Sequence, residues 1–179
     1  MMPPSKSTIA PVPALLSLAM RPLPLLPLQP ALFFLLDRVV RRHPGLFARL
    51  GPHADKRFGI DPTDLPFAFV LEPRRLRPRL AAVRTLPDDL DVRISGPLGG
   101  LMGLIDGELD GDALFFSRDL QVEGDFEAVV ALRNAIDDSQ IDLIGEIRSL
   151  FGPLGRPVEE VLRNGLRRLR PVDPAGFGV

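Results

Sequence analysis

Histidines and carboxylates are the residues of this 179-residue chain whose types could support catalysis. His43 and His53 are the only histidines, and each stands in a turn rich in Pro or Gly. Either imidazole could act as a general base in a small hydrolase, and that hypothesis predicts activity lost when the histidine is replaced. No Gly-x-Ser-x-Gly motif supplies a nucleophile, and Ser95 lies at the end of a predicted strand. We therefore expect two solvent-exposed loop histidines, no catalytic residue and no enzyme.

Two groups of carboxylates could bind a metal ion or a diphosphate. Asp137, Asp138 and Asp142 are similar to the diphosphate-binding acids of prenyl synthases, but those enzymes are long helical bundles with two such motifs. Residues 106–112 (DGELDGD) place four acids in a Gly-bearing loop, without the spacing or the distal Glu of an EF-hand. We expect a helix end in the first case and a solvated turn in the second, with no metal site and no cofactor.

Arginines gather in two clusters, at residues 74–79 (RRLRPR) and 167–170 (RRLR). The formal net charge is −1 and no stacking aromatics accompany either cluster, so we expect no nucleic-acid partner. The first cluster could be a solvated connection between strands, and the second could complement the negative end of a helix. The alternative is contact with anionic lipid headgroups, at roughly 1 kcal/mol per basic residue.

The composition predicts one substantial apolar core. Hydrophobic residues make up 45% of the chain, and 11 Phe carry most of the large apolar surface, because Trp and Tyr are absent. The chain has no Cys, which excludes disulfides and thiolate metal sites and suits a reducing compartment such as the cytoplasm. A pocket lined by such residues would select an apolar ligand.

The N-terminal region is apolar but does not resemble a membrane-spanning helix. Residues 7–36 contain one charge, Arg21, and are interrupted by Pro11, Pro13, Pro22, Pro24, Pro27 and Pro30. A signal peptide is one interpretation, since Lys6 precedes an apolar stretch, although the cleavage pattern is poor. The others are a flexible or polyproline-like tail packed over the domain, and an apolar arm that touches a membrane or covers a lipid pocket.

Hydrophobic periodicity predicts the elements that follow. Pro30 is expected as the first residue of a helix that ends before His43, with an apolar stripe of Leu32, Phe33, Leu36, Val39 and Val40. Residues 46–50 should form a short turn closed by Gly51. We expect strands at residues 66–72, 80–86 and 91–95 and a Gly-rich helix at 98–106 that borders a cavity, followed near the C-terminus by helices at 143–151 and 158–169.

Residues 110–138 are the most informative part of the chain. An acidic Gly-bearing loop leads into the apolar run 113–116, an alternating strand and the corner Gly124-Asp125. Asp125 is placed to cap a helix whose apolar face is Val129, Leu132 and Ile136. This order resembles the signature of the sterol-carrier-protein type lipid-binding domain and, in particular, the UbiT-type accessory factors of oxygen-independent ubiquinone biosynthesis. The resemblance is specific over these residues and diffuse back to about residue 61.

The resemblance implies an α+β fold in which a mostly antiparallel sheet and flanking helices enclose a hydrophobic lipid tunnel. We divide the chain into a Pro-rich apolar N-terminal arm (1–29), an N-terminal helical segment (30–58), the sterol-carrier-type lipid-binding domain (59–138) and C-terminal helices with a tail (139–179).

The residues expected to contact lipid are the apolar members of these elements. The resemblance transfers by position to Leu114–Phe116, Leu120, Val122, Gly124 and Asp125, of which the last two should fix the turn and the helix start. Any of the apolar residues could equally be ordinary core. The full expected set is Phe33, Leu36, Phe67, Phe69, Leu101, Met102, Ile105, Leu114, Phe115, Phe116, Leu120, Val122, Val129, Leu132 and Ile136.

The resulting hypothesis is a non-enzymatic lipid-binding accessory factor, cytoplasmic or peripheral to the inner membrane. It would shelter polyprenylated intermediates of ubiquinone biosynthesis and present them to the enzymes of that pathway. The alternative is an interaction scaffold that holds a multi-enzyme complex without binding lipid.

Overall fold

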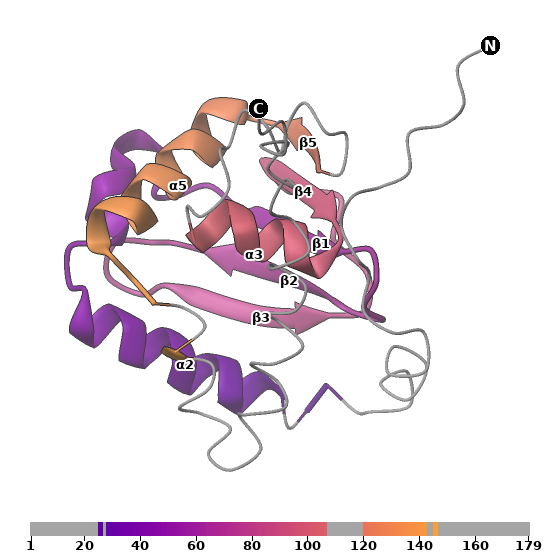
Figure 1. Cartoon of the computed structure of the whole chain (residues 1–179), viewed down its shortest axis with the longest axis horizontal. Coiled ribbons are helices and arrows are strands. Elements are labelled where there is room, and N and C mark those ends of the chain that lie inside the picture. Colours follow the sequence, from indigo (N-terminus) through magenta and orange to yellow (C-terminus); the bar gives the residue numbers. More distant parts are fainter. Residues whose placement is uncertain (1–24, 27, 107–119, 143–144, 147–179) are drawn as a thin grey trace, which may run out of the picture.

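The computed structural model describes residues 25–26, 28–106, 120–142 and 145–146. They form a five-stranded sheet with helices packed mainly on one face (Figure 1). The elements in chain order are α2 (Leu28–Arg42), a 3-10 helix η1 (Phe47–His53), β1 (Phe58–Pro62), β2 (Ala68–Glu72), β3 (Arg79–Val83), β4 (Val92–Gly96), α3 (Leu98–Asp106), β5 (Gln121–Gly124) and α5 (Phe126–Ser139).

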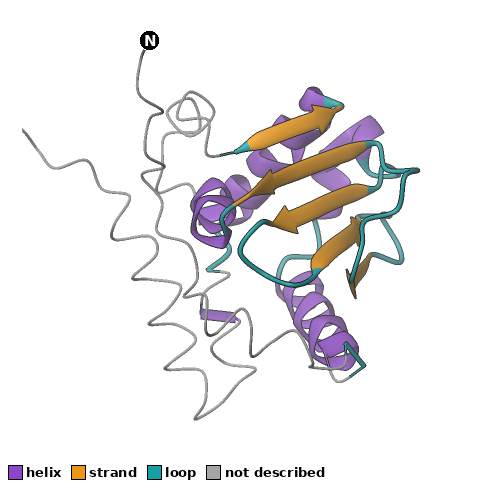
Figure 2. Ribbon diagram, turned by 90° about the vertical axis from the view of Figure 1, so that its right-hand side faces the viewer, coloured by secondary structure: helices purple, strands orange, loops and turns teal. Residues whose placement is uncertain are grey.

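The strand order is β3-β2-β1-β4-β5, and Figure 2 shows the strands as one continuous sheet. Neighbouring strands pair antiparallel except β1 and β4, which run parallel. The predicted α+β class with a mostly antiparallel sheet is therefore confirmed. Within the described part of the chain, no helix is long and apolar enough to span a bilayer.

The main core lies between one face of the sheet and the helices. Phe58 of β1 and Val92 of β4 are adjacent in register and almost fully buried there. The opposite face has a smaller apolar cluster, in which Leu86 and Leu90 of the β3–β4 connection cover Gly59. The sheet is thus covered on both sides at β1 and β2, as predicted for residues 66–72.

Most predicted elements are present, with shifted ends. The helix at 98–106 has the predicted bounds, and β2, β3 and β4 overlap the three predicted strands. Helix α2 begins at Leu28, so Pro30 lies within its first turn rather than opening it. Proline is tolerated there because the first-turn amides have no intrahelical acceptor. The predicted run 113–116 and nearly all of the two predicted C-terminal helices lie outside the described residues.

Strand β1 was not predicted, although it is the central strand. Its sequence FGIDP is short, contains a glycine and ends at a proline, which are features that argue against a central strand. A Cβ at Gly59 would meet the ends of the Leu86 and Leu90 side chains, so a larger residue there would force these leucines to shift. The alternation of Phe58 and Ile60 was the available signal.

Phe33 was wrongly assigned to the apolar stripe of α2. The buried face consists of Leu32, Leu35, Leu36 and Val39, at the spacing i, i+3, i+4, i+7. Phe33 follows Leu32 by about 100° around the helix. It therefore lies outside this face and is 64% exposed.

The first turn of α2 is attached to the edge of the sheet. The side-chain amide of Gln29 donates a hydrogen bond to the carbonyl oxygen of Ala82 (2.7 Å) and accepts one from its backbone amide (3.3 Å). Ala82 belongs to β3, the edge strand, and these are backbone groups that β2 does not use. The contact fixes α2 beside β3 (Figure 1).

The corner Gly124-Asp125 has the structural role predicted for it. Gly124 has a φ of +89°, and a Cβ at this position would overlap the carbonyl oxygen of Asp91. That oxygen accepts a hydrogen bond from the Asp125 amide (3.0 Å). The Asp125 carboxylate accepts from the Ala128 amide (3.0 Å), which confirms Asp125 as the N-cap of α5.

We predict that Gly124→Ala lowers the free energy of unfolding by at least about 2 kcal/mol, because strain at positive φ adds to the overlap with Asp91. Gly51→Ala, also at positive φ but with nothing within 4 Å of a new Cβ, should lose less than Gly124→Ala, because backbone strain acts there without an overlap. Gly45→Ala, in open space, should change stability by less than about 0.5 kcal/mol.

Urea unfolding followed by circular dichroism measures all three, since the chain has no Trp or Tyr to report by fluorescence. Equal losses in the three variants would contradict the role given to the Gly124 corner.

Candidate functional site

The candidate site is an apolar cavity of about 170 Å³ between the sheet and the helices. Fifteen of its sixteen lining residues are apolar, so the cavity offers almost no hydrogen-bonding groups to a ligand or to water. The lining residues are Leu35, Leu36, Val39, Leu46, Phe47, Ile60, Leu71, Leu80, Ile94, Leu101, Leu104, Val129, Leu132, Arg133, Ile136 and Ile141.

Four strands build one wall. Ile60 is paired with Ile94 across the parallel β1–β4 ladder, and Leu71 is paired with Leu80 across β2–β3. Paired residues point to the same face of a sheet, so the four side chains form one continuous apolar surface.

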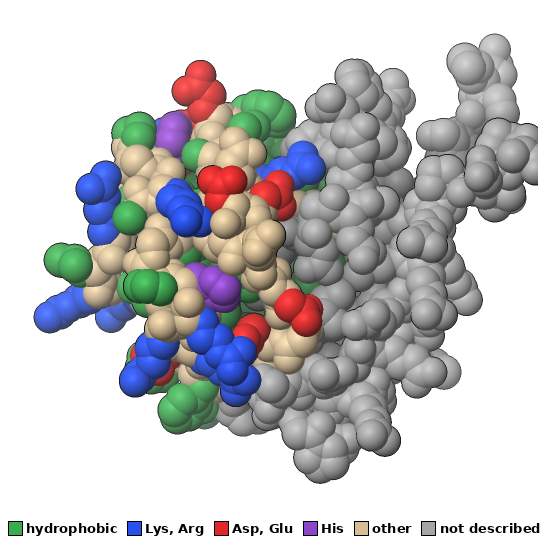
Figure 3. All heavy atoms as spheres, turned by 60° about the vertical axis from the view of Figure 1, so that its left-hand side comes forward, with side chains coloured by type: hydrophobic (Ala, Val, Ile, Leu, Met, Phe, Trp, Pro, Cys, Tyr) green, Lys and Arg blue, Asp and Glu red, His purple; other side chains and the backbone are tan. Residues whose placement is uncertain are grey.

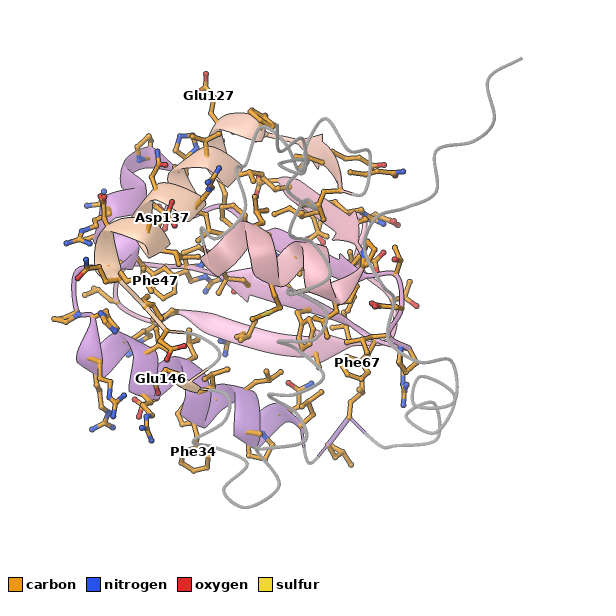
Figure 4. The ribbon with its side chains drawn as sticks, in the orientation of Figure 1. Phe34, Phe47, Phe67, Glu127, Asp137 and Glu146 are labelled. Atoms are coloured by element: carbon orange, nitrogen blue, oxygen red, sulfur yellow. The ribbon has the colours of Figure 1, made fainter. Side chains whose placement is uncertain are left out.

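The helices build the opposite wall. Val129, Leu132 and Ile136 project from α5 at the spacing i, i+3, i+7, and Leu101 and Leu104 project from α3 at i, i+3. The glycines of α3 are buried, and the helix borders the cavity through Leu101 and Leu104, in agreement with the prediction. Phe47, at the start of η1, also lines the cavity and is labelled below α5 in Figure 4.

The structure brings five of the fifteen predicted lipid-contacting residues to the cavity. Met102 and Leu120 are buried in the same core, and Val122 packs against it, but they do not line the cavity. The five that line it are Leu36, Leu101, Val129, Leu132 and Ile136.

Of the remaining predicted residues, Phe33 lies on the exposed side of α2 and does not line the cavity. Phe67 and Phe69 form an edge-to-face pair with centroids 5.5 Å apart, half-buried and away from the cavity lining. Phe67 is labelled beyond the end of β3 in Figure 4. Leu114, Phe115 and Phe116 lie outside the described residues, as does the side chain of Ile105.

Sequence reasoning missed several residues of the cavity. Helical spacing could have found Leu35, one turn before Val39 of the predicted stripe, and Leu104, one turn after the predicted Leu101. Ile60 could not be found while β1 was unrecognised. Arg133 is charged, so the hydrophobic pattern of the sequence gave no reason to place it at an apolar cavity.

The histidines do not form a catalytic arrangement in the described structure. His53 is not the exposed loop residue that was expected, because its side chain is only 16% exposed and its Nδ1 lies 3.9 Å from Asp125 Oδ2. Asp125 already caps α5 and forms an ion pair with Lys56. The Asp125 carboxylate therefore has a structural role in these contacts.

The acids at the end of α5 also have local partners. Asp142 accepts a hydrogen bond from the Gly145 amide (2.8 Å), and Asp137 lies 3.6 Å from Arg133 Nε. Among the described residues, no three His, Asp or Glu side chains are arranged to hold a metal ion. On the face in Figure 3, basic and acidic side chains are interspersed rather than gathered by sign.

One buried acid joins α2 to the segment after α5. Glu146 forms ion pairs with Arg38 (2.6 Å) and with Arg42, both on α2, and Figure 4 shows it directed toward that helix. Ile141, five residues earlier, lines the cavity, as do Leu36 and Val39 of α2. The ion pairs therefore connect the segment after α5 to a helix that lines the same cavity.

Comparison with known proteins identifies this architecture. The SCP-2 sterol transfer family matches residues 36–137, more than half of the chain and a region that contains all five strands. The solved structure titled "UbiJ-SCP2 Ubiquinone synthesis protein" has a TM-score of 0.52 and 20% identity, covering 65% of this chain and 99% of that one. At this identity the similarity shows a shared fold.

Sterol carrier protein 2 of Yarrowia lipolytica, in its apo form, gives a TM-score of 0.43 at 13% identity, covering 57% of this chain and 81% of that one. The sterol carrier protein domain 2 of Helicoverpa armigera gives 0.45 at 13%, covering 61% and 84%. Comparison with curated proteins gave no match. From the match over residues 36–137, we conclude that the chain belongs to the SCP-2 sterol transfer family.

Proposed function

We propose that this protein is a lipid-binding accessory factor that shelters polyprenylated intermediates of ubiquinone biosynthesis and presents their head groups to partner enzymes. The observation that carries the proposal is the apolar cavity within the region matched by the family. The ubiquinone pathway is supported by the resemblance of residues 110–138 to UbiT-type factors and by the relative titled as a ubiquinone synthesis protein.

The physical need for such a protein follows from the size of a prenyl tail. Burial of apolar surface contributes roughly 0.8 kcal/mol per carbon, or about 4 kcal/mol per five-carbon unit. A tail of several units therefore does not enter water unaided. A protein that covers the tail leaves the polar ring accessible to soluble hydroxylases and methylases, which would form the bonds.

The cavity volume limits how much of a tail is enclosed at once. A cavity of about 150 Å³ lined by Leu, Ile and Phe accommodates a benzene molecule, and the present cavity is of that size. It can hold roughly one isoprenoid unit or one ring. Longer tails require α2, α3 and α5 to move apart from the sheet, or a further apolar surface.

The place of action in this proposal is the cytoplasmic side of the inner membrane, where such lipids partition. Peripheral contact would be made by the Pro-rich arm (residues 1–29), most of which lies outside the described residues. No catalytic residue or cofactor is part of the proposal.

One observation favours the alternative function, an interaction scaffold that does not bind lipid. Phe33 and Phe34 of α2 are 64% and 60% exposed and stack edge to face, which is uncommon for a water-facing surface. Native mass spectrometry after purification from cells separates the two hypotheses. A co-purifying isoprenoid supports the carrier, and an empty protein that binds only pathway enzymes supports the scaffold.

We predict that Val129→Phe weakens binding of a prenyl lipid at least about tenfold, because the added ring occupies the cavity. Val130→Phe is the matched control, since Val130 is the next residue on α5 but is exposed. Binding is measured by titration with geranylgeraniol, and folding by the thermal midpoint.

Overpacking typically costs about 1–3 kcal/mol, and the existing void should keep the Val129 variant near the lower value. Wild-type binding by a folded Val129→Phe protein would contradict the cavity as the lipid site.

We also predict that cells lacking this protein lose ubiquinone when grown without oxygen and retain it with oxygen, since the resemblance is to factors of the oxygen-independent pathway. Quinone extraction followed by chromatography measures this. Normal anaerobic ubiquinone would remove the pathway assignment while leaving lipid binding intact.

A further inference from the structure

Arg133 is the one charged residue among those that line the described cavity. It follows Leu132 on α5, and its side chain is 27% exposed. Almost the whole cavity surface is carbon, so Arg133 lines it with its methylene groups, and the partly exposed guanidinium lies at the edge of the cavity rather than inside it.

The hydrogen-bonding capacity of Arg133 is incompletely used. A guanidinium has five N–H donors and keeps its charge at all physiological pH values. Among the described residues, the nearest carboxylate oxygen is Oδ2 of Asp137, which lies 3.6 Å from Nε and is too far for a hydrogen bond. Nε itself is buried and has no hydrogen-bond partner within the described part of the chain.

We propose that Arg133 recognises an oxyanion on the head group of the bound lipid, a carboxylate or a phosphate, while the tail lies among the leucines. This inference rests on the proposed lipid-binding function and adds the class of head group. An arginine can form two parallel hydrogen bonds to either oxyanion, whereas a neutral hydroxyl accepts weaker ones. The apolar surroundings strengthen the charge interaction relative to open water.

In this proposal Asp137 weakens the binding of an anionic head group. It stands one turn after Arg133 and partly neutralises the guanidinium in the absence of lipid. A bound oxyanion would lie near the Asp137 carboxylate and be repelled by it. Removal of the two charges should therefore change the affinity for an anionic lipid in opposite directions, which a purely structural ion pair would not do.

The experiment uses three probes with one tail: geranylgeranoic acid, geranylgeranyl phosphate and geranylgeraniol. Dissociation constants are measured for the full-length protein and its variants at fixed ionic strength. Arg133→Gln should weaken binding of the acid and the phosphate about tenfold and change binding of the alcohol less than about twofold. Asp137→Asn should tighten binding of the two anions about twofold or more.

Arg41→Gln is the matched control. Arg41 and Asp37 form another Arg–Asp pair four residues apart, joined through Nε and Oδ2 (2.8 Å), but Arg41 is 77% exposed and does not line the cavity. This variant should leave all three affinities unchanged. Arg133→Lys keeps the charge but cannot form two parallel hydrogen bonds to an oxyanion. Its affinity for the two anionic probes should therefore lie between those of the wild type and Arg133→Gln. This variant replaces Arg133→Gln in the test if the Gln variant does not fold.

Two results overturn the inference and leave the proposed function in place: equal wild-type affinity for acid and alcohol, or losses in Arg133→Gln that are the same for all three probes. Inorganic phosphate binding as tightly as geranylgeranyl phosphate would also overturn it, because the anion would then be held without the lipid. Failure of all three probes to bind the wild-type protein would instead remove the proposed function.

Discussion

The parallel pairing of β1 with β4 is the constraint on which the rest of the structure depends. It joins two antiparallel units, β1-β2-β3 and β4-β5, that follow one another along the chain. Without this ladder the two units would have no common face. Because Phe58 lies beside Val92 and Ile60 beside Ile94, the pairing also creates the centre of the apolar surface on which the helices pack.

The two walls of the cavity differ in how they are held. The sheet wall is fixed by backbone ladders and is supported from behind by Leu86 and Leu90. The helical wall is held by side-chain packing, by the cap at Asp125 and by the ion pairs of Glu146 with α2. Backbone ladders resist separation more than side-chain contacts do, so an entering tail would displace the helices.

The sequence was a good guide to local structure. Asp125 and Gly124 could be assigned because a cap and a positive φ are properties of a few adjacent residues. Helical spacing likewise found Val129, Leu132 and Ile136. Phe33 shows the limit of such reasoning, because a stripe drawn through several apolar residues does not reveal which side of it faces the sheet.

The cavity was less predictable, for a physical reason. It is bounded by residues from nearly every described element, and its lining depends on which strands are neighbours. Ile60 became part of the wall only through its partner Ile94, 34 positions later. Arg133 could not be distinguished from any surface arginine, since its significance comes from the apolar residues around it rather than from the chain next to it.

The bond between Gln29 and Ala82 has a consequence for self-association. An uncovered outer strand offers its amides and carbonyls as a template for a strand from another molecule, which is a common route to aggregation. Here one glutamine side chain mimics a single residue of such a strand and satisfies both backbone groups. Intermolecular sheet growth at that position must first detach the beginning of α2, so this helix protects the protein against polymerisation as well as covering its interior.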